Sequence, residues 1–265
     1  MMATTENRTV DLLCVAGAGG SAMSFRPLSR ATDLTGVNVV PLDLPRAAPS
    51  PGPGGESATV GIATYAQRLS ARLLALPSVI LPGHSLGALV AYEMARAASP
   101  LPVGPRVLHL IVLACPAPDR LSAASPPTEP QDDDVDPVEH LMATGELSAA
   151  ADAVVPQDLR SDLRAWQNYR APTGAAPLPV PVTVVAGRYN TGIEPVRLER
   201  WSKFTKDWHG LRWVPARHDV LAEAAPYTAR EVARIVSTTV GTDCEETPHT
   251  VAGRPDTPHG KGGTP

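Results

Sequence analysis

The sequence predicts a doubly wound α/β fold, in which helices cover both faces of a mostly parallel sheet. Short, mostly apolar runs recur along the chain and end in glycine or proline, as strands buried on both faces do. Segments with apolar residues at helical spacing stand between these runs. With 265 residues, of which 43% are hydrophobic, the chain can bury one such core but is short for two domains.

Six strands are expected in the sheet, each separated from the next by a helix or a long loop. They cover residues 10–16, 37–45, 78–82, 106–115, 179–187 and 211–215. Helical patterns occupy 60–76, 88–98 and the stretch from the sixth strand to about residue 236. Because strand runs alternate with helices, the sheet is expected to be parallel, with helices on both sides.

A single domain spans residues 10–240 in this interpretation. Residues 1–9 are an N-terminal extension, and residues 241–265, rich in Thr, Pro, Gly and charge, are expected to be a disordered tail. Between the fourth and fifth strands, residues 117–177 show no strand signal. An insertion of this length is expected to be a helical lid, the alternative being a surface excursion without function.

Charge and cysteine content narrow the class of function. A formal net charge of -4 provides no basic field for nucleic acid or an anionic membrane, so neither partner is expected. No apolar run reaches the length of a bilayer span, and the N-terminal residues lack the pattern of a signal peptide. Cys14, Cys115 and Cys244 suggest neither a disulfide framework nor a metal site. A cytoplasmic location is expected.

The chemistry is expected at a glycine-flanked serine. Gly83-His84-Ser85-Leu86-Gly87 follows an apolar strand and opens a helix, which is the setting that a GxSxG motif requires. On such a sharp turn, larger side chains at Gly83 and Gly87 would collide with the adjacent strand and helix. Ser85 is then held above the carboxyl edge of the sheet, near the positive end of a helix dipole. The motif predicts a serine hydrolase of the α/β-hydrolase kind, with Ser85 as nucleophile.

Two backbone amides are expected to form the oxyanion hole. One is the N–H of Leu86, directly after the nucleophile. The other comes from the glycine-rich loop at residues 16–21, where Ala18 is the expected donor. Gly17, Gly19 and Ala22 in this loop also fit a loose GxGxxA pattern, with Asp43 about twenty residues on, so a dinucleotide-binding turn is an alternative.

The general base is expected late in the chain, because the order on this scaffold is nucleophile, acid, histidine. His218 follows the sixth strand, where the loop returns over the carboxyl edge of the sheet, and is the candidate base. His209 is placed before that strand, at its far end. The remaining histidines are expected in packing positions (His84, His109), in the insertion (His140) or in the tail (His249, His259).

A catalytic triad needs an acid beside the serine and the histidine, and this sequence has no carboxylate at the usual position of that acid. The turn after the fifth strand carries Asn190 where an aspartate would orient the histidine. The Asn190 amide oxygen can accept the histidine N–H but brings no charge. Glu194 and Asp119 are alternative acids, although Glu194 more simply begins a helix. Asp219 adjoins the base and is expected to point away.

Five segments together resemble a known family. They read LLCVAGAGGSAMSFRPL, LDLP, VILPGHSLGALVAYEMARAA, LPVPVTVVAGRYN and VPARHDVL. In order and spacing they are similar to the type II thioesterases that accompany polyketide and nonribosomal peptide synthases, over about residues 10–236. The resemblance implies an enzyme that hydrolyses acyl thioesters from the phosphopantetheine arm of an acyl or peptidyl carrier protein, without a dissociable cofactor or metal. By position it makes Ser85 the nucleophile, His218 the base and Asn190 the counterpart of the family's aspartate.

Three departures from the family pattern stand at the edge of the expected site. Asn190 replaces an aspartate, Arg217 replaces the glycine that usually precedes the histidine, and Pro45-Arg46-Ala47 replaces a PGR-type turn. These departures leave two alternatives to hydrolysis open. One is an acyl-transfer or ring-forming release enzyme, and the other is a non-catalytic protein that binds carrier proteins.

Overall fold

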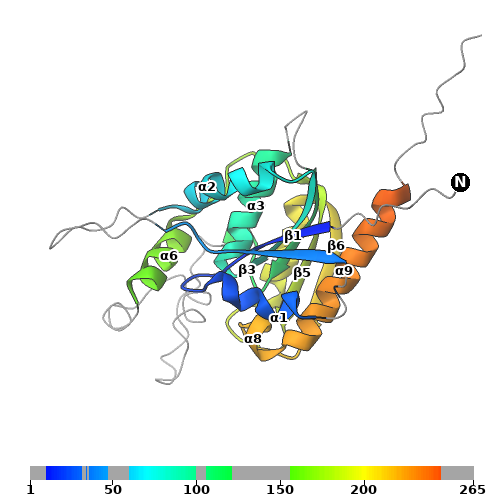
Figure 1. Cartoon of the computed structure of the whole chain (residues 1–265). Coiled ribbons are helices and arrows are strands. Elements are labelled where there is room, and N and C mark those ends of the chain that lie inside the picture. Colours follow the sequence, from blue (N-terminus) through cyan, green and yellow to red (C-terminus); the bar gives the residue numbers. More distant parts are fainter. Residues whose placement is uncertain are drawn as a thin grey trace, which may run out of the picture.

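The computed structural model describes residues 10–31, 34, 36–46, 60–99, 106–120 and 156–245. At its centre lies a six-stranded sheet with the strand order β2-β1-β3-β4-β5-β6 (Figure 1). Every neighbouring pair of strands in this order is parallel. The carboxyl ends of all these strands therefore lie along the same edge of the sheet, where the expected site residues were placed.

The strands are β1 (Val10–Val15), β2 (Val37–Leu42), β3 (Ser78–His84), β4 (Arg106–Leu113), β5 (Leu178–Gly187) and β6 (Thr205–Val214). The first five begin and end close to the predicted limits. β6 begins earlier than predicted, and the placement of His209 before the sixth strand is wrong, because His209 lies within β6. β6 is an edge strand with many exposed positions, so its first half lacks the continuous apolar run that marks the buried strands.

Helices cover both faces of the sheet (Figure 1). One face packs against α2 (Ile62–Leu74), α3 (Leu86–Ala98), α6 (Gln157–Asn168) and α7 (Pro195–Glu199). The other packs against α1 (Arg26–Ser29), α8 (Val220–Glu223) and α9 (Ala225–Glu245). Short 3-10 helices, η1 (Ala22–Phe25), η3 (Pro118–Arg120) and η4 (Arg200–Lys203), complete the connections. The sequence prediction of a parallel sheet between two helical layers is confirmed.

α9 continues beyond the predicted helix end near residue 236. Its last turns contain Thr and Gly, which have low intrinsic helix propensity, so the sequence signal fades there. Val240 nevertheless packs against the apolar core beneath α9. This tertiary contact favours the helical conformation where local propensity does not.

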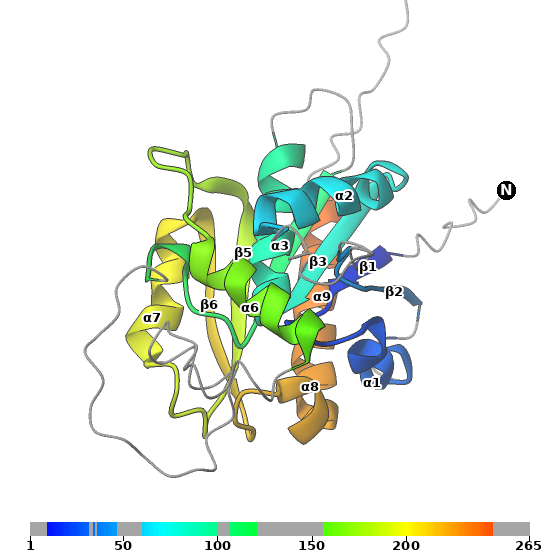
Figure 2. The ribbon, with the colours of Figure 1, turned by 90° about the vertical axis from the view of Figure 1, so that its left-hand side faces the viewer.

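Several predicted regions lie outside the described residues. They are the N-terminal extension, the end of the tail and the middle of the insertion, which include His140, His249 and His259. α6 is the described helix of the insertion, and Figure 2 shows it in front of the central strands, at their carboxyl ends. Within the described ranges, no helix has both the length and the apolar character that crossing a bilayer requires. Cys14 and Cys115 are buried free thiols.

Candidate functional site

The turn between β3 and α3 holds Ser85 in a strained conformation. Its φ is 51° and its ψ is -126°, a backbone region that residues other than glycine rarely occupy. A Cβ at Gly83 would lie 2.4 Å from the Gly87 carbonyl oxygen, and one at Gly87 would lie 2.3 Å from the Val15 carbonyl oxygen. Glycine is therefore required at both flanks for β3, α3 and β1 to approach so closely, and the turn presents Ser85 above the sheet edge.

His218 reaches Ser85 from the loop after β6. Its Nε2 lies 3.2 Å from the Ser85 Oγ, within hydrogen-bonding distance. A Cβ at Gly187 would lie 1.8 Å from the carbonyl oxygen of Arg217, so only glycine at the end of β5 admits this loop. The two groups come from positions 133 residues apart, and the parallel sheet brings them together at its carboxyl edge.

Two backbone N–H groups beside Ser85 are available to a ligand. In the part of the chain that the structure describes, neither the Ala18 amide nor the Leu86 amide donates to another backbone carbonyl. Leu86 is the first residue of α3, where helical N–H groups have no partner within the helix. The Ala18 loop packs on the elbow, since a Cβ at Gly17 would lie 3.3 Å from the Ser85 Cβ. An oxyanion hole requires backbone N–H groups that have no acceptor within the protein, and both amides meet this requirement among the backbone contacts described.

Burial keeps the imidazole of His218 neutral. Desolvation, followed by the positive charge that His84 can carry, lowers the pKa of His218 to about 3. Only 6% of His218 is exposed, and the two imidazole rings lie 5.5 Å apart. His84 also places its Nε2 3.3 Å from the His218 carbonyl oxygen, so it supports the loop that carries the base. Sequence reasoning assigned His84 only a packing role, although its position inside the elbow places it next to Ser85.

Asn190 is the predicted triad residue that the structure brings to the other side of His218. Its Nδ2 lies 3.4 Å from the His218 Nδ1, and its Oδ1 accepts a hydrogen bond of 3.0 Å from the Gly192 N–H. The Gly192 N–H can only donate, so it requires the amide oxygen and directs the amide NH2 group towards His218. This local Asx turn determines which end of the Asn190 amide faces the imidazole.

The orientation of the Asn190 amide selects a histidine tautomer. An NH2 group donates, so the His218 Nδ1 must be its acceptor and the ring proton must lie on Nε2. In that tautomer Nε2 donates to Ser85 and cannot take its proton. An aspartate at this position would accept from both Gly192 and the His218 Nδ1–H, leaving Nε2 free to act as a base.

The other candidate acids have different partners. Glu194 is exposed at the start of α7, where its carbonyl oxygen accepts the Arg197 N–H. Asp119, in η3, forms an ion pair with Arg200. Asp219 caps α8 and accepts the backbone N–H groups of its first turn at 3.0 and 3.2 Å. Among the described residues, none of these carboxylates hydrogen-bonds to His218.

Comparison with known proteins gives the family. Residues 10–239 match the thioesterase domain family. The chain belongs to this family. A relative, the probable cadicidin biosynthesis thioesterase of Streptomyces griseus, is 28% identical over 235 residues, which cover 86% of this chain. The aligned part spans 63% of that longer relative.

Solved structures share the fold of this thioesterase-family chain. The type II thioesterase BorB from the borrelidin biosynthetic cluster is 25% identical, with a TM-score of 0.63, and the match covers 88% of this chain and 92% of BorB. The RedJ thioesterase of the prodiginine pathway in Streptomyces coelicolor is 23% identical, with the same TM-score of 0.63, over 85% of this chain and 89% of RedJ. The predicted α/β-hydrolase fold is confirmed.

Two departures from the family pattern have clear positions in the structure. Arg217, just before the base, turns towards α8, where its N–H and side chain both contact Glu223, at 3.0 and 3.5 Å. Arg46 points the other way, into a cluster with Asp162 of α6. Arg217 therefore does not reach Ser85, whereas Arg46 contacts the loop that carries Ala18.

The alternative of a dinucleotide-binding turn does not fit the loop after β1. Such a turn leads directly into a helix whose amino terminus holds the pyrophosphate. Here the loop leads into the four-residue η1, and the following α1 is equally short. The Asp43 Oδ1 accepts the Ala22 N–H at 2.6 Å, so this carboxylate closes the loop itself.

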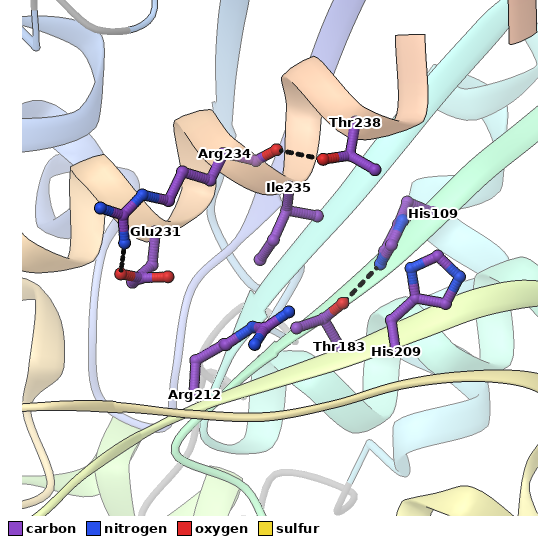
Figure 3. A pocket seen from close by; sticks show the side chains of 8 residues that line it. All are labelled: His109, Thr183, His209, Arg212, Glu231, Arg234, Ile235 and Thr238. Atoms are coloured by element: carbon purple, nitrogen blue, oxygen red, sulfur yellow. Dashed lines mark hydrogen bonds and ion pairs between the residues drawn. The ribbon is translucent and has the colours of Figure 1, made fainter. Parts of the chain in front are cut away.

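A pocket of about 380 Å³ lies on the other face of the sheet, between β4, β5, β6 and α9 (Figure 3). Its lining residues are His109, Thr183, His209, Arg212, Glu231, Arg234, Ile235 and Thr238. The two ring nitrogens of His109 lie 2.9 Å from the Thr239 Oγ1 and 2.8 Å from the Thr183 Oγ1. Desolvation, followed by the charge of His209, lowers the pKa of His109 to about 3. With both nitrogens engaged, His109 is a structural polar link between the sheet and α9, as its predicted packing role implies.

Proposed function

We propose that this chain is a serine thioesterase that hydrolyses acyl thioesters from the phosphopantetheine arm of an acyl or peptidyl carrier protein. The observation that carries the proposal is the 3.2 Å approach of the His218 Nε2 to the Ser85 Oγ, beside the Ala18 and Leu86 amides. Family membership supports thioester chemistry. The cadicidin, borrelidin and prodiginine relatives are all named as thioesterases of biosynthetic pathways, which supports a biosynthetic role. The resemblance of the sequence to type II thioesterases directs this proposal to polyketide or nonribosomal peptide biosynthesis. The buried free thiols Cys14 and Cys115 are compatible with the proposed cytoplasmic location.

In the proposed reaction, His218 takes the proton of Ser85 while the Ser85 Oγ attacks the thioester carbonyl carbon. The carbonyl oxygen becomes an oxyanion held by the amides of Ala18 and Leu86. Collapse of this intermediate breaks the carbon–sulfur bond, and the pantetheine sulfur leaves with the proton from His218. Water then attacks the acyl-serine carbonyl carbon while His218 accepts a proton from the water. The bond between the acyl carbon and the Ser85 Oγ breaks, Ser85 recovers the proton from His218, and the free acid departs.

Asn190 sets a limit on the rate of this reaction. His218 must carry its proton on Nδ1 to accept a second proton at Nε2, and the Asn190 NH2 group opposes that tautomer. The imidazolium formed in each step also has no carboxylate beside it. The proposed enzyme is therefore slow compared with one that has an aspartate at this position.

The test is hydrolysis of an acylated carrier protein by the wild type and by Ser85→Ala. The wild type is expected to release free acid, and Ser85→Ala is expected to reduce this to the uncatalysed background while still binding the carrier. Free-acid release that is unchanged in Ser85→Ala would refute the assignment of the nucleophile. Product analysis separates the alternatives, because acyl transfer or ring formation would yield an ester, amide or lactone in place of the acid, and a carrier binder would yield no product.

A further inference from the structure

A buried carboxylate joins the insertion to the loop after β1. Asp162 of α6 has a fully buried side chain, and its two oxygens accept four hydrogen bonds. The donors are the Gly19 N–H at 2.9 Å, the Arg46 Nε and Nη2 at 3.0 and 2.7 Å, and the Tyr65 hydroxyl at 2.8 Å. A carboxylate without such partners would be strongly destabilising in this position. The cluster is therefore a specific part of the fold and not a chance surface contact.

The cluster hydrogen-bonds to the glycine-rich loop through a backbone N–H and through a backbone carbonyl oxygen. The Asp162 Oδ2 accepts the Gly19 N–H, and the Arg46 Nη2 donates to the Gly20 carbonyl oxygen at 3.1 Å. A further bond of 3.1 Å, from the Gly20 N–H to the Gly17 carbonyl, closes a turn with Ala18 and Gly19 at its centre. Gly19 has a φ of 62°, a left-handed conformation that glycine adopts without strain. The peptide that joins Ala18 to Gly19 is held directly by Asp162.

α6 is also packed against the same loop and fastened at its other end. A Cβ at Gly19 would lie 2.9 Å from the Leu159 side chain, so the helix and the loop are in direct contact. At the far end of α6, the Tyr169 hydroxyl donates to the Glu93 Oε1 of α3 at 2.6 Å. Figure 2 shows α6 crossing in front of α3 and the central strands. The helix thus connects the two segments that supply the amides of the oxyanion hole.

We propose that Asp162 is a positioning residue for the oxyanion hole, acting through the Gly19 N–H to hold the Ala18 amide in place. This inference rests on the proposed function, in which the Ala18 amide binds the oxyanion. Removal of the carboxylate leaves the Gly19 N–H and the Arg46 guanidinium without their acceptor, and the turn loses its support from α6. The Ala18 amide contributes chiefly in the transition state, so its displacement lowers kcat and changes KM little.

The test compares Asp162→Ala with Asp162→Asn, which has nearly the same shape. The asparagine can present its oxygen to Gly19 and its NH2 group to the Tyr65 oxygen, so it keeps the contact with the loop and loses only the charge. We expect Asp162→Ala to lower kcat about 10-fold to about 100-fold, less than the full loss of an oxyanion donor, with KM within about threefold of the wild type. Asp162→Asn should recover most of this loss.

The matched control is Tyr169→Phe, which removes a hydrogen bond of α6 at the end remote from the loop. It is expected to keep kcat near the wild-type value. A second readout is the affinity for an aryl boronic acid, whose tetrahedral adduct on Ser85 places an oxygen between the two amides. We expect this affinity to fall in Asp162→Ala in proportion to kcat, and to be unchanged in Tyr169→Phe.

A kcat and a boronate affinity in Asp162→Ala equal to those of Tyr169→Phe would overturn the positioning role. If Asp162→Ala does not fold, Asp162→Ser takes its place, because the serine hydroxyl is too short to reach Gly19 and the same results are expected. Ser85→Ala separates this inference from the proposed function. Full activity in Ser85→Ala refutes the proposed function, whereas inactive Ser85→Ala with a fully active Asp162→Ala refutes the positioning role alone.

Discussion

Replacing Asn190 with aspartate is the most direct test of how the site is limited. In Asn190→Asp, the carboxylate oxygen that takes the place of Nδ2 would lie near the present 3.4 Å from the His218 Nδ1, while the other oxygen keeps the 3.0 Å bond from the Gly192 N–H. The carboxylate can only accept, so it draws the ring proton to Nδ1. Nε2 then becomes an acceptor for the Ser85 proton.

The size of the effect follows from the geometry. A carboxylate and an imidazolium separated by 3.4 Å attract each other by about 5 kcal/mol at an effective dielectric constant of about 20. This attraction is offset in part by desolvation of the partly buried carboxylate, and it would raise the pKa of His218 well above its present value of about 3. The corrected tautomer and the stabilised imidazolium together are expected to increase kcat/KM at neutral pH by about 100-fold to about 10,000-fold.

The assay is hydrolysis of one acylated carrier protein between pH 5 and pH 9. The wild type should show no loss of kcat/KM from protonation of His218 in this range, because its pKa lies near 3. Asn190→Asp should be faster and should lose activity towards the acidic end of this range, because the raised pKa of His218 brings its protonation into it. Asn190→Ala has neither the NH2 group nor a charge. It should show neither the large gain in kcat/KM nor the loss of activity at low pH. An aspartate variant with the wild-type rate and pH profile would refute the role given to Asn190.

Three further predictions concern stability and the alternative acid. His218 and His109 are buried and have pKa values of about 3. Below about pH 6.5 the unfolded chain therefore binds more protons than the folded chain, and the free energy of unfolding falls as the pH drops. Each of these histidines should account for a loss of about 2 kcal/mol between pH 7 and pH 5. Urea unfolding should show this loss, and His109→Asn should reduce it by about 2 kcal/mol. An unchanged pH dependence would contradict the explanation. Gly87→Ala should destabilise the fold by more than about 3 kcal/mol in thermal unfolding, because the added Cβ would lie 2.3 Å from a carbonyl oxygen. The matched control is Gly241→Ala in α9, which should be neutral or stabilising because the added Cβ would lie in open space. Equal melting temperatures for these two alanine variants would count against the tight elbow. Glu194→Gln should keep thioester hydrolysis within about twofold of the wild type, since the side chain is an exposed helix-start residue; a large loss would identify it as the missing acid.

The architecture was predictable because its signals are local. Buried parallel strands are continuous apolar runs, and the elbow combines a strand, a glycine-flanked serine and a helix within a short stretch. The placement of His218 follows from chain order on this scaffold, and the structure brings it to Ser85 at 3.2 Å. The edge strand β6 was predicted only in its second half, because one-sided exposure interrupts the apolar pattern.

The orientation of Asn190 was not predictable in the same way. The sequence shows an amide where an aspartate is usual, but the direction of that amide depends on the Gly192 N–H, two residues on. The Asn-Thr-Gly order is a recognisable Asx-turn signal. Only the folded chain shows that this turn directs the NH2 group at the His218 Nδ1.

The sequence by itself determined the order of the strands along the chain, the elbow at Ser85 and the absence of a carboxylate at position 190, since each depends on residues close together in the chain. Tertiary structure decided which groups meet across the fold. Asp162 contacts Gly19 across 143 residues, and His218 contacts Ser85 across 133. Such contacts depend on how the parallel sheet aligns its carboxyl edge and on how α6 packs over it, which no local sequence pattern specifies.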